Sequence, residues 1–112
     1  MNHTIFCLYL SKGCDFSQVV QSLKNYGFDN LNENTYLIGD FNFDVSGCND
    51  LTRYLTSINY IQIVKRATHL DGHILDQVYV QETKARRIEI QHHHPYYSDH
   101  NGVLVSLKKD VM

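Results

Sequence analysis

Ile38-Gly39-Asp40-Phe41-Asn42-Phe43-Asp44 is the stretch that decides the fold of this chain, because two later segments complement it. These segments are Ile74-Leu75-Asp76-Gln77-Val78-Tyr79-Val80 and Ser98-Asp99-His100. In each, an apolar β-type run delivers an acid, an amide or an imidazole at or near its end. Three sets of polar groups carried separately to the rim of a sheet are what a metal-assisted hydrolytic site requires.

The first stretch brings two polar side chains to the end of a strand. Residues 35–39 are typical of a short strand, and side chains two positions apart on a strand share a face. If the extended conformation continues, Asp40 and Asn42 project to the same side. Gly39 removes a side chain beside them, which lets another backbone or a substrate approach closely.

The second stretch places a carboxylate among aliphatic side chains. Strand alternation puts Ile74, Asp76, Val78 and Val80 on one face, and Leu75, Gln77 and Tyr79 on the other. Burial of an unpartnered carboxylate is costly, and His100 is the candidate partner, since an Asp–His pair stabilises the protonated imidazole. Asp99 is then free to face a cation. Taken singly, each acid is better explained structurally: Asp40 as a turn residue, Asp76 as a hydrogen-bonded core acid and Asp99 as a cap.

Taken together, the three segments resemble the C-terminal motifs of the endonuclease/exonuclease/phosphatase superfamily. These metal-dependent phosphodiesterases include abasic-site nucleases and retrotransposon endonucleases. Order, spacing and form all agree, and the motifs with their strands span residues 4–107. The resemblance implies an α/β fold of the α+β type, part of a two-sheet β-sandwich flanked by helices, and corresponds to the C-terminal half of that fold.

The resemblance also implies a role for each matching residue. Asp40 matches the acid that activates or orients the attacking water, and Asn42 matches the amide that supports it and contacts phosphate. Asp76 matches the carboxylate that orients the terminal histidine. Asp99 matches a metal-site acid, and His100 matches the histidine that binds the scissile phosphate.

Family members carry further site residues before the first motif. They have an asparagine on the first strand and a metal-ligating glutamate on a later one, whereas only 39 residues precede Asp40 here. Glu33 lies in a polar, turn-like run and is not assigned as that ligand. Tyr9 takes the place of a family tyrosine and is predicted to bind substrate, although the usual arginine and proline are absent. We therefore expect residues 1–112 to form one domain of this family, truncated on its N-terminal side.

Half of such a sandwich should leave strand edges and an apolar sheet face uncovered. Self-association, binding of a missing N-terminal half, or origin as a fragment of a longer gene product would each account for this, and we favour the fragment. Within the 112 residues, 43% hydrophobic content and one proline indicate a globular chain able to bury a core.

Charge and cysteine content constrain the partners and the compartment. A net charge of −2 and a pI near 6.3 give no general attraction to nucleic acid, although a local basic rim remains compatible with it. Lys65-Arg66 and residues 84–87 could form such a rim, but solvated loops and strand edges are the favoured explanation. Three cysteines without a CxxC pair indicate a reducing compartment, and no segment resembles a signal or membrane span. We expect an intracellular protein, nuclear or cytoplasmic.

The order of expected elements alternates between strands and helices. Strands are predicted at residues 4–10, 35–39, 60–64, 75–80, 87–91 and 102–107. Asp15 is the expected cap of a helix that Gly27 ends, with Gln18 at the capping-box position. Asn49 or Asp50 is expected to cap a second helix, whose apolar residues follow helical spacing.

Histidines and tyrosines outside the motifs admit two explanations each. His92-His93-His94-Pro95 is a solvated loop or a metal site, and the loop is favoured because neighbours on an extended chain face opposite ways. Tyr96 and Tyr97 either stack on a base or pack the loop onto the sheet. Thr68-His69 resembles the threonine-bearing approach to the Asp76 segment in retrotransposon-type members; otherwise His69 is a hydrogen-bonded loop histidine.

The implied function is a divalent-metal-dependent phosphodiester hydrolase of the endonuclease type, from a mobile-element-like gene. Its cofactor would be Mg²⁺ or Mn²⁺, since hard oxygen ligands suit these ions, and its partner would be nucleic acid, DNA rather than RNA. The alternative is a non-catalytic remnant that folds and binds metal or nucleic acid weakly. Without the glutamate and asparagine, we expect the 112-residue chain alone to show little or no DNA cleavage.

Overall fold

The computed structural model describes residues 3–30, 34–93, 99–100 and 102–107. In chain order its elements are β1 (Thr4–Tyr9), α1 (Phe16–Asn25), η1 (Phe28–Asn30), β2 (Thr35–Asp40), α2 (Asp50–Ser57), β3 (Tyr60–Gln62), β4 (Asp76–Gln81), η2 (Glu82–Arg87), β5 (Ile88–His93) and β6 (Gly102–Leu107). Every strand and helix expected from the sequence is present, with small shifts at the ends. The two short 3-10 helices η1 and η2 were not predicted.

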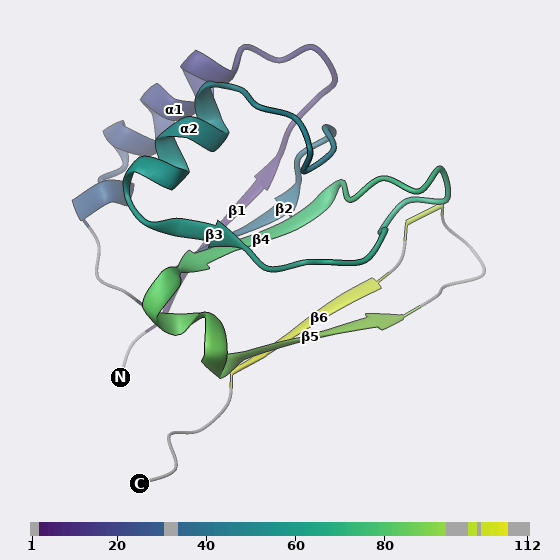
Figure 1. Ribbon diagram of the computed structural model, residues 1–112. Helices are drawn as coiled ribbons and strands as arrows, with labels where there is room; N and C mark the ends of the chain where they lie inside the picture. The colour runs from purple at the N-terminus through teal and green to yellow at the C-terminus, as the bar shows by residue number, and fades with distance from the viewer. Residues whose placement is uncertain (1–2, 31–33, 94–98, 101, 108–112) are drawn as a thin grey trace, which may run out of the picture.

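The molecule is built from three layers (Figure 1). The central layer is a four-stranded sheet in the order β1-β2-β4-β3, in which β1 is parallel to β2 and the other pairs are antiparallel. Helices α1 and α2 cover one face of this sheet, and the antiparallel pair β5–β6 lies against the other. The expected class is confirmed: a mixed α/β structure with two sheets and flanking helices.

Side-chain caps define where both helices begin. The Asp15 carboxylate accepts a hydrogen bond from the backbone N–H of Ser17 and caps α1, as predicted. Gln18 contacts Asp15 through its backbone N–H. Asn49 caps α2 through a reciprocal capping box with Thr52. These caps fix the residue at which each helix begins.

Two apolar clusters hold the layers together, one on each face of the four-stranded sheet. The helix-side cluster is formed by Leu10, Leu23, Phe28, Leu37, Phe41, Leu51, Leu55, Tyr60 and Tyr79. The cluster between the two sheets is formed by Tyr36, Val64, Val78, Val80 and Ile88. The division of β4 follows the predicted alternation, with Val78 and Val80 on one side and Tyr79 on the other.

Strand β1 forms an outer edge of the four-stranded sheet, pairing with β2 alone among the described residues. Its Ile5 side chain is 57% exposed, so apolar surface is uncovered there, as expected from the sequence. Cys7, Cys14 and Cys48 are free thiols. No helix within the described ranges is long and apolar enough to cross a membrane.

Candidate functional site

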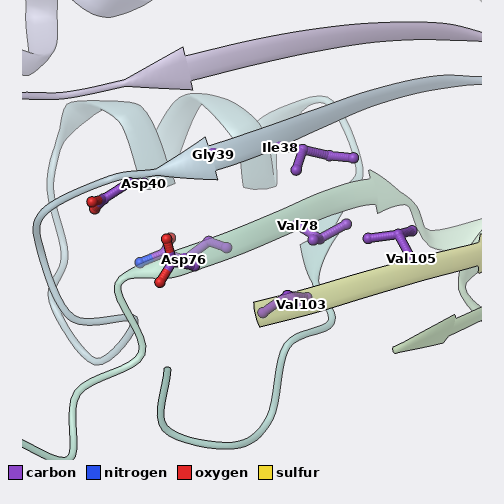
Figure 2. Close-up of a pocket in the computed structure, with 8 residues that line it drawn as sticks. Ile38, Gly39, Asp40, Asp76, Val78, Val103 and Val105 are labelled. Carbon is purple, nitrogen blue, oxygen red and sulfur yellow. The ribbon is translucent and has the colours of Figure 1, made fainter. Parts of the chain in front are cut away.

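Sheet register places three polar residues in a row at one end of the four-stranded sheet. Tyr9 at the end of β1 pairs with Asp40 at the end of β2, and Asp40 pairs with Asp76 at the start of β4. Residues paired in register point to the same face of a sheet. Figure 2 shows the Asp40 and Asp76 side chains side by side at this end, beyond the valines that separate the two sheets.

Gly39 is what allows β1 and β2 to pair here. A Cβ at Gly39 would lie 1.8 Å from the backbone carbonyl oxygen of Leu8, well inside contact distance. The close approach of another backbone predicted for Gly39 is therefore confirmed. It brings Tyr9 up to Asp40.

His100 lies between the two carboxylates. Its Nδ1 is 2.6 Å from Asp76 Oδ2, and its Nε2 is 3.8 Å from Asp40 Oδ2. The predicted contact of Asp76 with His100 is confirmed, and Asp40 lies on the same rim. Like charges facing each other across strands repel, and an imidazolium between them relieves that repulsion.

The electrostatics of this group favour the charged histidine. The hydrogen bond to Asp76 raises the pKa of His100, assisted by the negative charges of Asp76, Asp40 and Asp99 and opposed by partial burial. His100 is 28% exposed at its side chain, so the imidazolium remains accessible from the pocket. It is held on Nδ1, which leaves Nε2 as the nitrogen available to a ligand.

Asn42 reaches the site in a different way from the one predicted. Its φ of 52° is left-handed, so the extended strand ends at Asp40 and the two side chains do not share a strand face. Instead the Asn42 backbone N–H donates to Asp40 Oδ1 at 3.0 Å, an Asx turn that restrains the carboxylate. The Asn42 side-chain amide donates to the backbone carbonyl of Leu10. The expected common face is thus wrong, although Asn42 still lines the same pocket.

A buried glutamine holds the loop after β2 in place. Gln77 is fully buried, and its Nε2 donates to the carbonyl oxygens of Phe43 and Ile74 at 2.8 and 3.0 Å. Its Oε1 accepts the Tyr79 hydroxyl proton at 2.7 Å. Asp44 adds a second tie, accepting from the backbone N–H of Ile74 at 2.8 Å. The loop bearing Asn42 is therefore fixed against the start of β4.

Thr68 holds the start of β4, including Asp76, in place in a similar way. Its buried hydroxyl oxygen accepts the backbone N–H groups of Leu75 and Asp76, each at 3.0 Å. The approach segment before β4 is thereby tied to the strand that carries the site acid. In the sequence, Thr68-His69 resembles the threonine-bearing segment that precedes the Asp76 motif. In the structure, Thr68 contacts the start of that motif directly.

The residue after Thr68 contacts the third motif directly. His69 and His100 form an isolated antiparallel bridge, and the Leu70 N–H donates to the Asp99 carbonyl at 2.9 Å. His69 Nε2 lies 2.9 Å from Asp99 Oδ2. Asp99 therefore already pairs with an imidazole, a contact that was not predicted from the sequence, while its carboxylate stays 59% exposed.

Most of the motif residues line one pocket of 490 Å³. Its lining includes the predicted residues Tyr9, Asp40, Asn42, Asp99 and His100. Lys12, His69, Asp71 and His73 line it as well, none of which was predicted as a site residue. Asp76 lies just behind, in a smaller cavity of 210 Å³ between the sheets. Tyr9 is 77% exposed, so its ring is available to a ligand.

Sequence carried little signal for the unpredicted residues. Lys12 follows β1 by three positions, and His69 follows Thr68 in a loop of mixed composition. The one available clue was the histidine- and aspartate-rich run His69, Asp71, His73 just before β4. Alternating polar residues in a loop are ordinarily solvated, so the sequence indicated only a hydrogen-bonded loop histidine at His69.

The predicted basic rim does not flank this pocket. Lys84 and Arg87 belong to η2, beyond the end of β4 opposite Asp76, and Lys84 is buried. Lys65 donates to the Gln62 carbonyl at 2.9 Å.

His92 and His93 of the histidine run end strand β5. The other residues considered from the sequence that lie outside the described residues are Glu33, His94, Pro95, Tyr96, Tyr97 and Ser98.

The donor set of the pocket is compatible with a divalent cation. Two groups hold ligand atoms within 4.8 Å of one another: His69, Asp99 and His100, and Asp40, Asp76 and His100. Mg²⁺ or Mn²⁺ commonly takes one or two carboxylates and completes its shell with water and phosphate oxygens. The Asp99 carboxylate, 59% exposed and facing the pocket, fits that requirement.

The arrangement of layers is of an endonuclease-like type, as comparison with known proteins shows. Among solved structures, the endonuclease domain of TRAS1, a telomere-specific non-LTR retrotransposon, matches with a TM-score of 0.73 at 14% sequence identity. The match covers 89% of this chain and 53% of that one, so the chain spans about half the length of this structural neighbour. No family model and no curated protein matches the chain.

Proposed function

We propose that this chain carries the phosphate-binding and water-activating side of a divalent-metal-dependent phosphodiester hydrolase of the endonuclease type, acting on nucleic acid and on DNA in preference to RNA. The observation that supports this most directly is the Asp76–His100–Asp40 row at the rim of a pocket that also contains Asp99. The fold it shares with a retrotransposon endonuclease domain supports the same class of reaction.

His100 is suited to bind a non-bridging phosphate oxygen. Its Nδ1–H donates to Asp76, which leaves the Nε2–H of the imidazolium directed toward Asp40 and the pocket. A charged donor held in place by a carboxylate stabilises the negative charge that develops on phosphorus oxygens during in-line attack. The raised pKa of His100, caused chiefly by the hydrogen bond to Asp76, favours the charged form of that donor.

Asp40 is suited to orient and deprotonate the attacking water. One of its oxygens is restrained by the Asn42 N–H, and the other lies 3.8 Å from His100 Nε2, so that acid and imidazole face the same part of the pocket. Tyr9 and Lys12 line the outer wall of the same pocket. A tyrosine ring and an ammonium are groups that contact nucleic acid backbones and bases.

The cofactor in this proposal is Mg²⁺ or Mn²⁺, held by Asp99 with water and substrate oxygens. When bound, such an ion polarises the phosphate and neutralises its charge. Asp40 would act on the water and His100 on the phosphate beside that ion.

The test is metal-dependent nicking of supercoiled DNA with the protein in excess over plasmid. We expect slow nicking with Mg²⁺ or Mn²⁺ that is lost on chelation and falls at least about tenfold in Asp40→Asn and in His100→Gln, because general base and charged-donor contributions are of that order or larger. Asp50→Asn is the matched control, since Asp50 is an exposed acid on α2 paired with Arg53.

Two results would overturn this proposal. The first is nicking that survives both site substitutions, which would trace the cleavage to a contaminant or another site. The second is a wild-type chain that neither nicks DNA nor binds a short duplex in a His100-dependent manner, as measured by fluorescence anisotropy. That second result would favour the non-catalytic remnant.

A further inference from the structure

The pocket contains two histidines arranged around one carboxylate. His69 Nε2 lies 2.9 Å from Asp99 Oδ2, and His100 Nε2 lies 3.9 Å from Asp99 Oδ1. The two imidazole rings are nearly perpendicular, at 88°, with centroids 4.9 Å apart. All three ligand atoms fall within 4.8 Å of one another.

These separations match those of a small transition-metal site. Zinc–nitrogen and zinc–oxygen bonds of about 2.0–2.2 Å in tetrahedral geometry place neighbouring ligand atoms about 3.4 Å apart. The observed 2.9 and 3.9 Å lie on either side of that value. Small rotations of the three side chains would bring their ligand atoms to the separations of a tetrahedral site.

Each histidine also has a carboxylate behind it. His100 Nδ1 is 2.6 Å from Asp76 Oδ2, and His69 Nδ1 is 3.0 Å from Asp71 Oδ1. A ligating imidazole typically donates its other N–H to a carboxylate, which fixes the tautomer and leaves the free nitrogen toward the metal. Both rings have Nε2 on the Asp99 side; at His69 the backbone N–H of Asp71 also approaches Nδ1, at 3.2 Å.

From this geometry we infer that His69, Asp99 and His100 form a binding site for a borderline divalent transition metal such as Zn²⁺ or Co²⁺, with Asp71 and Asp76 as supporting carboxylates and an open position toward the pocket. Imidazole ligands favour these ions over Mg²⁺. The inference goes beyond the proposed function and does not rest on it, since a transition metal here and the Mg²⁺ of the proposed reaction are alternative occupants of Asp99. Such an ion takes the Nε2 with which His100 would otherwise bind phosphate.

The probe is Co²⁺ added to the full chain without nucleic acid. Visible absorption reports the coordination of the bound ion, and calorimetry reports stoichiometry and affinity. We expect one Co²⁺ per chain, displaced by Zn²⁺ and not by a large excess of Mg²⁺. His69→Gln and Asp99→Asn should each weaken binding at least tenfold, and Asp71→Asn should weaken it by about tenfold, in line with supporting carboxylates elsewhere.

His3→Gln is the matched control. His3 hydrogen-bonds to the Tyr36 hydroxyl at the start of β2, the end of the strand opposite Asp40, so its loss should leave Co²⁺ binding unchanged. Circular dichroism checks that each variant is folded, and His69→Asn replaces His69→Gln if the latter unfolds.

The variant Asp40→Asn separates this inference from the proposed function. It should retain Co²⁺ binding while losing DNA nicking. Unchanged Co²⁺ affinity in His69→Gln would overturn the site, as would stoichiometric binding that depends on Asp40 instead, because the ion would then occupy the Asp40, Asp76 and His100 group. Failure of the wild-type chain to bind Co²⁺ would also overturn it.

Discussion

At the scale of single residues, the protonation of His100 depends on where three carboxylates lie. Asp76 makes the short hydrogen bond, and Asp40 and Asp99 add negative charge on the Nε2 side. The raised pKa of His100 follows from contacts between residues 24 and 60 positions apart in the chain. In the unfolded chain a histidine has none of these partners, and its pKa is about 6.5.

Asp76→Asn should lower the pKa of His100 toward its ordinary value, since the largest cause of the shift is removed. The folded-state pKa of His100 is raised, so its contribution to stability is fully present below about pH 6.5 and is lost as pH rises through the folded pKa. Asp76→Asn should therefore cost about 1–2 kcal/mol between about pH 5 and 6 and less at alkaline pH.

An NMR titration of the His100 ring and urea unfolding at several pH values measure the two effects of Asp76→Asn. His3→Gln provides the unaffected comparison. A pKa of His100 that stays raised in Asp76→Asn would show that Asp40 and Asp99 alone set it.

At the scale of secondary-structure elements, the site depends on how the β2 loop is attached to β4. Strand β2 ends at Asp40, and the residues that follow turn through a left-handed Asn42. The buried Gln77 amide then binds the Phe43 and Ile74 carbonyl oxygens together. A buried side chain that makes three hydrogen bonds is costly to replace, since each partner would be left unsatisfied.

Gln77→Leu should lower the free energy of unfolding by about 2–4 kcal/mol, because two carbonyl oxygens and the Tyr79 hydroxyl lose their partner in a buried place. Gln81→Leu on the same strand is the matched comparison. Gln81 is partly exposed and donates to the Ile58 carbonyl, so its loss should cost about 1 kcal/mol or less. Equal costs in urea unfolding would argue against a special role for Gln77.

At the scale of the whole molecule, the site is shared between layers. Asp40 and Asp76 come from the four-stranded sheet, whereas His100 precedes β6 of the two-stranded sheet. The packing between sheets, through residues such as Val78 and Ile88, therefore sets the position of His100. The match covers 53% of the TRAS1 endonuclease domain, so this chain spans about half the length of that structural neighbour.

Ile88→Ala should cost about 2–3 kcal/mol and also disturb His100, because it removes buried apolar contact between the two sheets. Leu55→Ala removes a similar volume on the helix side of the central sheet. It should destabilise the fold by a comparable or larger amount while leaving the His100 resonance and its pKa unchanged. If both variants shift His100 alike, the two-sheet packing is not what positions it.

The sequence alone determined the strands, both helices and the pairing of Asp76 with His100. Alternation on β4 and the apolar runs before each motif are local patterns, and burial of an acid on an apolar face demands a partner somewhere. Motif resemblance supplied the rest, including Asp40 on the same rim. None of these inferences required knowing how the loops run.

Only the tertiary structure decided how Asn42, Asp99 and His69 are placed. The left-handed turn at Asn42 ends the strand that sequence alternation would have continued. The bridge between His69 and His100 brings a loop histidine onto Asp99, which the chain order leaves 30 positions away. Such contacts arise when separately formed elements pack, because loop geometry depends on the buried side chains that anchor the loop as well as on the loop's own residues.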